Sequence, residues 1–188
     1  MSAQAHAQKA LPPSLIGMVL FISSETMFFG GLFAAYFSLR AAAGAWPPSG
    51  VELEILLPGL ATLALISSSG TIMLAERKAA AGDRKGTGRW LAITVALGVA
   101  FLGAQIYDYG HLGFTVKDGA FQTLFFTMTG FHGAHVAAGL VTFGVIGLRN
   151  AQGNISADSH GPLIAAGYYW HFVDVVWILL FATLYLLK

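Results

Sequence analysis

Five stretches of this sequence are each long and apolar enough to cross a lipid bilayer, and this constrains the fold more than any other feature. An α-helix rises about 1.5 Å per residue, so crossing the hydrocarbon layer takes about 20 apolar residues. Soluble domains carry about 25% charged residues. This chain of 188 residues carries 10%, and 56% of it is hydrophobic. The sequence therefore predicts an all-α, polytopic membrane protein, a single domain built as a bundle of five transmembrane helices over residues 14–39, 55–75, 90–107, 121–148 and 164–187.

Lysine and arginine in the connecting segments predict how these helices are oriented, because positive side chains concentrate in cytoplasmic loops. The segment between the second and third stretches holds Arg77, Lys78, Arg84, Lys85 and Arg89. Placing it in the cytoplasm also places Lys9 and Arg149 there, and leaves Arg40, Lys117 and Lys188 outside. The N-terminus is therefore predicted to be cytoplasmic and the C-terminus outside. The net charge of +1 gives no indication of nucleic-acid binding.

Five ionisable residues lie deep inside the apolar stretches. Glu25 lies about 16 Å along the first stretch, close to the bilayer midplane. On the fourth and fifth stretches, which run in opposite directions, His132 falls level with Asp174 and His135 level with His171. An intramembrane charge costs at least about 2.5 kcal/mol, so such groups pair with one another inside a bundle. We therefore expect a buried polar network in which a histidine is the partner of Glu25.

The chemistry of this group leaves several alternatives open. Glutamate, histidine and aspartate are ligands of zinc and iron, and histidines from two helices hold b-type haem. The chain has no cysteine, no paired Glu-x-x-His motifs such as di-iron bundles use, and no HExxH motif. The sequence therefore favours a hydrogen-bonded structural network, with a proton or ion path as the alternative. No metal, no cofactor and no catalytic residue are expected on this chain.

Small residues predict close packing between helices. Gly30 and Ala34, like Gly133 and Ala137, repeat at a four-residue spacing that lets backbones approach each other. The same spacing relates Gly31 to Ala35 and Gly130 to Ala134. The run of residues 67–70, Ser-Ser-Ser-Gly, is suited to hydrogen bonds between helices.

Three segments resemble the subunit III family of haem–copper oxidases. TMTGFHGAHVAAGL (residues 127–140) and YYWHFVDVVWILLFATLYL (residues 168–186) look like the last two helices of that family. SSETMFFGGLFAAYF (residues 23–37) resembles its glutamate-bearing helix. The resemblance covers nearly the whole chain. The family has a longer form with seven helices, and this chain resembles the short five-helix form, which lacks the first two.

The resemblance implies a non-catalytic accessory subunit of an aerobic respiratory terminal oxidase, a proton-pumping cytochrome c oxidase in a prokaryotic plasma membrane. The expected partners are oxidase subunits I and II, which hold the haems and copper, and membrane phospholipids. The implied role is to stabilise subunit I and to support its proton uptake. The family's buried polar positions fall on Glu25, His132, His135, His171 and Asp174. Its lipid cleft, bounded by the two missing helices, is not carried over intact.

Other functions remain open on the sequence alone. Within the family, the alternatives are subunit III of a quinol oxidase or a nitric-oxide-reductase-associated relative, and the YWHFVDVVW segment favours the cytochrome c type. Outside it, the alternatives are a small haem-binding membrane protein or a transporter. An odd number of spans argues against an inverted-repeat transporter, whose halves would match.

Overall fold

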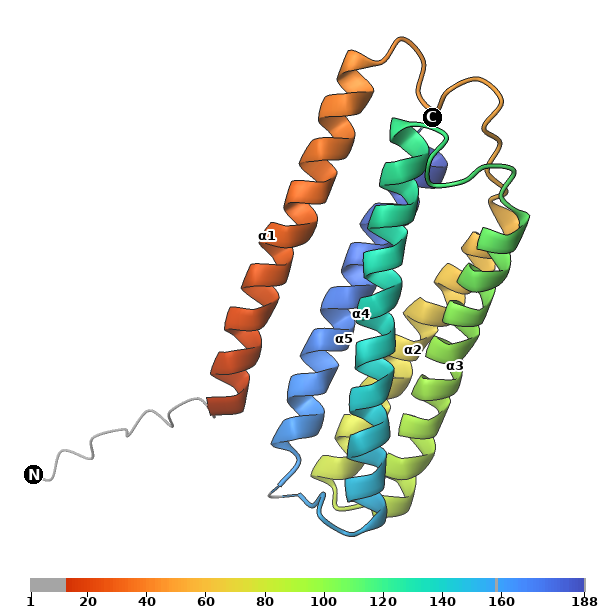
Figure 1. The fold of residues 1–188 in the computed structure, drawn as a ribbon. Helices are drawn as coiled ribbons and strands as arrows, with labels where there is room; N and C mark the ends of the chain where they lie inside the picture. Colours follow the sequence, from red (N-terminus) through yellow and green to blue (C-terminus); the bar gives the residue numbers. More distant parts are fainter. Residues whose placement is uncertain (1–12, 158, 188) are drawn as a thin grey trace, which may run out of the picture.

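The computed structural model describes residues 13–157 and 159–187 and contains five long helices (Figure 1). They are α1 (Pro13–Ala42), α2 (Leu56–Ala80), α3 (Arg84–His111), α4 (Ala120–Ala151) and α5 (Gly161–Phe181), and α5 continues into the short π-helix η1 (Ala182–Leu186). All five are long and apolar enough to cross a membrane. The predicted all-α architecture with five membrane-spanning helices is confirmed.

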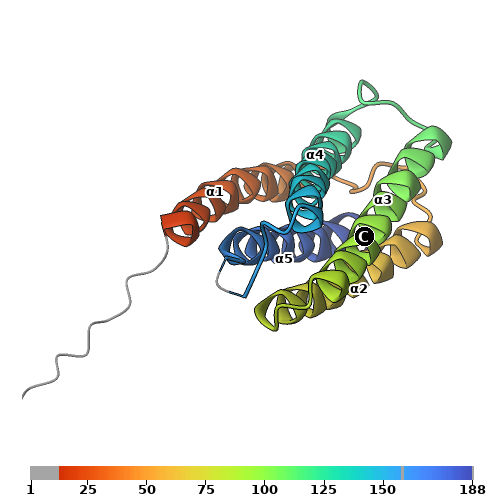
Figure 2. The ribbon, with the colours of Figure 1, turned by 90° about the horizontal axis from the view of Figure 1, so that it is seen from below.

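The helices form a four-helix bundle with α1 on its side. Helix α2 packs against α3 and α5, α4 packs against α3 and α5, and α1 packs against α5 and α4. Viewed along the bundle, α1 stands beside α5 and α4 and away from α2 and α3 (Figure 2). In the most apolar part of each helix, 61% of the α5 residues are buried, against 6% for α1. Helix α5 is therefore the centre of the bundle, and α1 turns almost all of its surface outward.

Helix α3 begins at Arg84, well before the predicted start at Trp90, because a tight turn follows α2. Gly82 adopts a left-handed conformation with φ +72°, which ends α2. Asp83 then caps α3, because its side chain accepts a hydrogen bond of 2.8 Å from the backbone N–H of Gly86. This bond, together with the ion pair to Lys78, holds the pKa of Asp83 below its usual value.

A tryptophan at the centre of the bundle joins four helices. The indole of Trp170 on α5 is fully buried and donates a hydrogen bond of 2.8 Å to Ser68 Oγ on α2. A methyl group added to Gly98 of α3 would lie 2.9 Å from this indole, and one added to Gly139 of α4 would lie 2.7 Å from it. The two glycines therefore form the notches that admit the ring, since side chains in close-packed interiors leave no spare room.

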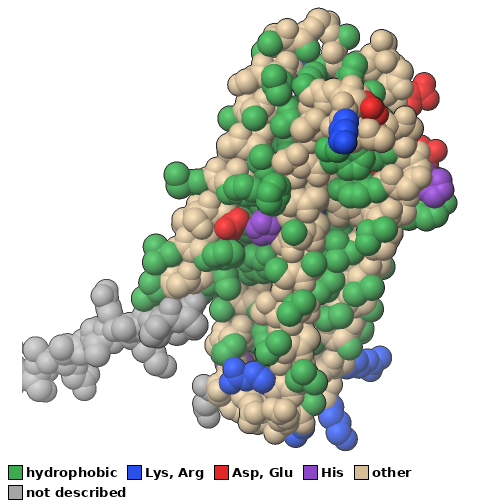
Figure 3. All heavy atoms as spheres, in the orientation of Figure 1, with side chains coloured by type: hydrophobic (Ala, Val, Ile, Leu, Met, Phe, Trp, Pro, Cys, Tyr) green, Lys and Arg blue, Asp and Glu red, His purple; other side chains and the backbone are tan. Residues whose placement is uncertain are grey.

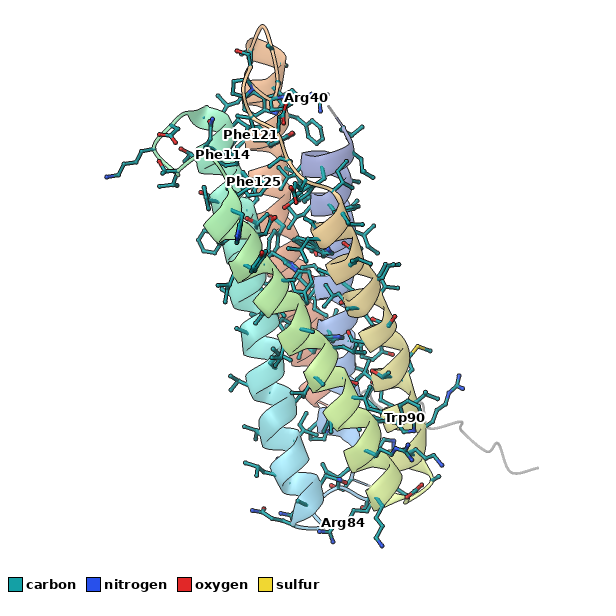
Figure 4. The ribbon with its side chains drawn as sticks, turned by 90° about the vertical axis from the view of Figure 1, so that its right-hand side faces the viewer. Arg40, Arg84, Trp90, Phe114, Phe121 and Phe125 are labelled. Atoms are coloured by element: carbon teal, nitrogen blue, oxygen red, sulfur yellow. The ribbon has the colours of Figure 1, made fainter. Side chains whose placement is uncertain are left out.

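Basic side chains gather at one end of the bundle. On the face shown in Figure 3, hydrophobic side chains cover the middle and most Lys and Arg side chains lie at the lower end. Arg84 and Trp90 lie near that end, and Arg40 lies at the opposite one (Figure 4). Lys9 and Lys188 fall outside the described residues. That the basic end faces the cytoplasm stays a prediction.

The small-residue spacings are only partly used inside the chain. A methyl group added to Gly133 would meet the side chain of Gln105 at 3.0 Å, so α3 and α4 approach closely there. One added to Gly30, Gly31 or Gly130 would meet no other atom of the described chain within 4 Å. At these three positions, no other helix of the described chain approaches closely, so a close contact with a helix of another chain stays a prediction. All three glycines are exposed, and Gly130 lines a groove between α3 and α4.

Candidate functional site

Glu25 of α1 contacts His135 of α4, one of the histidines expected as its partner. Glu25 Oε2 lies 2.9 Å from His135 Nε2, and His135 Nδ1 lies 2.7 Å from the carbonyl oxygen of Phe131. A carbonyl only accepts hydrogen bonds, so Nδ1 carries a proton. The contact at Nε2 then joins either an imidazolium to a carboxylate or a neutral imidazole to a carboxylic acid. In both states, the pair shares one proton and carries no net charge.

The pair lies at the edge of the bundle rather than at its centre. The side chains of Glu25 and His135 are 20% and 15% exposed. The rings of Phe28 and Phe29 lie beside the imidazole, with centroids 6.4 Å and 5.1 Å from its own. Tyr169 of α5 donates a hydrogen bond of 2.9 Å to the His135 carbonyl and so ties the third helix to the pair.

A second polar group joins α2 to α5. His171 Nδ1 lies 2.8 Å from Ser69 Oγ, and the Ser69 hydroxyl donates to Asp174 Oδ2. His171 and Asp174 are three residues apart on α5 and share one face. The sequence indicated Ser69 as a residue for helix contacts, but not as a member of the polar network. The run of serines at residues 67–69 was the sequence feature that could have indicated this role.

His132 stands apart from both groups. Its ring is fully buried between Phe101 and Trp177, with centroid distances of 5.6 Å and 4.9 Å. Within residues 13–157 and 159–187, no group hydrogen-bonds to either of its ring nitrogens. The five predicted residues therefore do not form one network. Two of them pair directly, two are joined through Ser69, and His132 packs among aromatic rings.

We expect the substitution His132→Phe to stabilise the protein. A buried polar group without a partner costs about 1–3 kcal/mol, and an apolar ring of similar shape removes that cost. The measurement is the free energy of unfolding in detergent, with His135→Phe as the control, which removes a paired imidazole and should destabilise. A loss of stability in His132→Phe would show that the His132 ring nitrogens bind a partner.

Two further contacts between helices were not foreseen. Gln105 and Tyr109 on α3 reach Thr129 on α4, with Gln105 Nε2 2.7 Å from the Thr129 carbonyl and Tyr109 Oη 2.6 Å from Thr129 Oγ1. Near the opposite end from the basic residues, Tyr185 donates a bond of 3.2 Å to Asp108. The four-residue spacing of Gln105 and Tyr109 was the signal for the first contact.

The hydrogen bonds at these two groups allow protons to be shared between side chains. In the part of the chain that the structure describes, no three His, Asp or Glu side chains lie close enough to hold a metal ion. Each polar group instead has hydrogen bonds along which a proton can move, one between α1 and α4 and one between α2 and α5.

Comparison with known proteins gives consistent matches over nearly the whole chain. The sequence model described as "Cytochrome c oxidase subunit III" matches residues 3–188. A protein of Thermostichus vulcanus named "Cytochrome c oxidase subunit 3" is 43% identical over 183 residues, which is 97% of this chain and 91% of the relative. A protein of Synechocystis sp. with the same name is 43% identical over 187 residues, which is 98% of this chain and 80% of the relative. One of Nocardia farcinica, named "Probable cytochrome c oxidase subunit 3", is 41% identical over 177 residues, 92% of this chain and 87% of the relative.

Proposed function

This chain belongs to the cytochrome c oxidase subunit III family, and from that premise we propose that it is a non-catalytic subunit that stabilises subunit I of a respiratory oxidase and supports its proton uptake. The redox centres, haems and copper, belong to subunits I and II in this proposal. Oxygen reduction takes place there, on the partner chains. The role of this chain is to cover its partner and to hold exchangeable protons beside it.

The observation that carries this proposal is the partly exposed pair of Glu25 and His135. The pair lies on membrane-spanning helices, yet about a fifth of the Glu25 side chain is exposed at the edge of the bundle. Lipid tails offer no hydrogen bonds, so exposed polar groups at this depth are costly unless another molecule covers them. We propose that the surface formed by α1 and α4 around this pair is covered in the oxidase complex.

The shape of α1 supports the same assignment. Its glycines Gly30 and Gly31 have open space where a side chain would stand. Small residues of this kind let a neighbouring helix approach closely in a membrane, where packing rather than the hydrophobic effect drives association. Helix α1 thus offers an exposed, apolar surface with two glycines at its middle, and subunit I is the proposed partner.

A phospholipid is the second proposed partner. An apolar groove of about 390 Å³ runs between the first half of α1 and the start of α5. It is lined by Leu15, Ile16, Met18, Val19, Leu20, Ile22 and Tyr168. An acyl chain fits such a lining, and the basic residues at this end of the bundle favour anionic headgroups. We propose the plasma membrane of a prokaryote as the location, with the basic end and the N-terminus in the cytoplasm.

Removing this chain from the oxidase should leave haem content and the initial rate of oxygen reduction largely unchanged. The expected losses are weaker proton supply and a shorter activity half-life during turnover, because subunit I loses the helices that cover part of its surface and the lipid bound with them. The measurement compares haem spectra, initial rates and half-lives of complexes with and without the chain, after tagged purification has identified subunits I and II as companions.

Two outcomes would contradict this role. An initial rate near zero with normal haem content would point to a direct part in the reaction for Glu25 and its partner. An unchanged rate together with an unchanged half-life would limit the chain to assembly of the complex.

A further inference from the structure

Three polar side chains from two helices form one continuous hydrogen-bonded chain inside the membrane-spanning region. Ser69 on α2 bonds both to His171 Nδ1, at 2.8 Å, and to Asp174 Oδ2. Asp174 is only 5% exposed, and its second oxygen has no hydrogen-bond partner among the described residues. A buried carboxyl group is therefore connected to an imidazole through a single hydroxyl group.

The imidazole end of this chain opens into a groove. A groove of about 170 Å³ between α2 and α5 is lined by Met73, Glu76, Ile164, Tyr168 and His171. Glu76 lies in the last part of α2 and Ile164 in the first turn of α5, so the groove extends from His171 toward the basic end of the bundle. Since Ser69 occupies Nδ1, Nε2 is the ring nitrogen left for the groove.

Two tryptophans hold this geometry in place. Trp170 donates a hydrogen bond of 2.8 Å to Ser68 Oγ, and Trp177 donates one of 2.8 Å to Thr62 Oγ1. Both donors lie on α5 and both acceptors lie on α2. These two bonds fix the position of α5 relative to α2, and with it the three polar groups that join the same two helices.

The hydrogen bonds determine where a proton can go. A serine hydroxyl has one proton, and because Ser69 donates it to Asp174, His171 Nδ1 must donate to Ser69. When a proton binds at Nε2, the Nδ1–H bond breaks and its proton joins Ser69 Oγ, while the original hydroxyl proton moves to Asp174 Oδ2. The products are a neutral imidazole protonated at Nε2, an intact serine and a carboxylic acid. One proton has entered, and the carboxylate has been neutralised.

We propose that Ser69, His171 and Asp174 form a proton-exchange site, in which His171 takes protons from the groove and Ser69 passes them to Asp174. Its substrate is the proton itself, and no other reactant is consumed. The biological role of this site rests on the proposed function, because in the oxidase complex the site would supply protons to subunit I. Whether the site exchanges protons depends on this chain alone.

Other titratable groups on the packed helices have separate positions. On the helices that contact α5, the acidic and histidine side chains are Glu25 of α1, Glu76 of α2, and His132 and His135 of α4. Glu25 and His135 bond to each other, and His132 lies between aromatic rings. Of these groups, Glu76 alone shares the groove with His171. A proton that enters the groove from the basic end therefore meets the Glu76 carboxylate before it reaches His171.

Infrared spectroscopy of the purified full chain, together with the subunits that co-purify with it, tests this proposal. At a pH low enough to protonate Asp174, the full chain should give a carboxylic-acid C=O band that is lost in the Asp174→Asn variant and shifts after transfer to D2O. In Ser69→Ala, the hydroxyl that connects the two groups is gone, and the rate of that shift should fall by about 10²-fold, the size typical of a well-placed proton-transfer group. Ser69→Thr, which keeps the hydroxyl, should exchange at the native rate.

Ser67→Ala is the matched control, because Ser67 is an exposed serine two residues away whose hydroxyl, among the described residues, bonds only to the Leu63 carbonyl of its own helix. It should leave the exchange rate unchanged. If Ser69→Ala does not assemble, His171→Phe gives the same comparison, since it keeps a ring of similar size and removes the proton acceptor.

The proposal is overturned if the band persists in Asp174→Asn, or if Ser69→Ala exchanges as fast as the native chain. Failure of the proposed function would look different. In that case, subunits I and II would not co-purify with the chain, or its removal would change neither rate nor half-life, whereas the dependence of proton exchange on Ser69 would remain.

Discussion

Replacing Trp170 by alanine should destabilise this protein by about 3–5 kcal/mol, the usual cost of removing a buried aromatic ring. The indole is fully buried, packs 5.1 Å from the ring of Phe143, and fills the notches at Gly98 and Gly139. Its loss leaves a cavity between α3, α4 and α5. It also removes the hydrogen bond to Ser68 that joins α5 to α2.

The measurement is the free energy of unfolding of the purified chain, titrated with denaturing detergent. Tyr168→Ala provides the matched control, because Tyr168 is a neighbouring aromatic residue that is 53% exposed. The free energy of unfolding of the Tyr168→Ala variant should stay within about 0.5 kcal/mol of the native value, as for other surface substitutions. A Trp170→Ala variant that loses less than about 1 kcal/mol would contradict the central position of this side chain.

The second largest effect is expected when the pair of Glu25 and His135 is broken from one side. His135→Leu should cost about 2.5 kcal/mol, because it leaves an acid without a partner inside the membrane. Glu25→Leu should cost less, since a neutral imidazole that still bonds to the Phe131 carbonyl remains. The double variant should recover most of the stability, because two apolar side chains replace a complete pair without leaving either member alone.

A double-mutant cycle on the unfolding free energies measures this coupling. Ser24→Ala serves as the control on α1, because Ser24 is exposed and its hydroxyl bonds, within the part of the chain that the structure describes, only to the Phe21 carbonyl of its own helix. It should be close to neutral, both alone and combined with His135→Leu. If the two single effects at Glu25 and His135 simply add up in the double variant, the two side chains do not stabilise each other.

Some of the structure could be predicted from the sequence, because it depends on length and local chemistry. Apolar stretches of about 20 residues form membrane-spanning helices whatever they pack against, since every backbone group must be hydrogen-bonded within the helix. The unexpectedly early start of α3 is also local in origin. Gly82 and Asp83 provide the helix end and the helix cap within a turn of a few residues.

A histidine partner for Glu25 was expected from the sequence, but which histidine it is, and the link of His171 to Asp174 through Ser69, could not be predicted in the same way. Depth along the helices placed His135 level with His171, yet His135 pairs with Glu25, and His171 is joined to Asp174 through Ser69. Depth fixes the position of a residue along a helix axis. It says nothing about the direction in which the side chain points around that axis.

In a soluble helix, an apolar stripe would reveal that direction. Helices that are apolar all round carry no such stripe, because lipid and protein interior accept the same side chains. The sequence by itself therefore determined the number of spanning helices, their approximate ends, and which residues bring charge into the membrane. Only the tertiary structure decided how the helices are rotated, because that rotation depends on contacts between helices, such as the fit of the Trp170 ring against Gly98 and Gly139, and not on any property of a single helix.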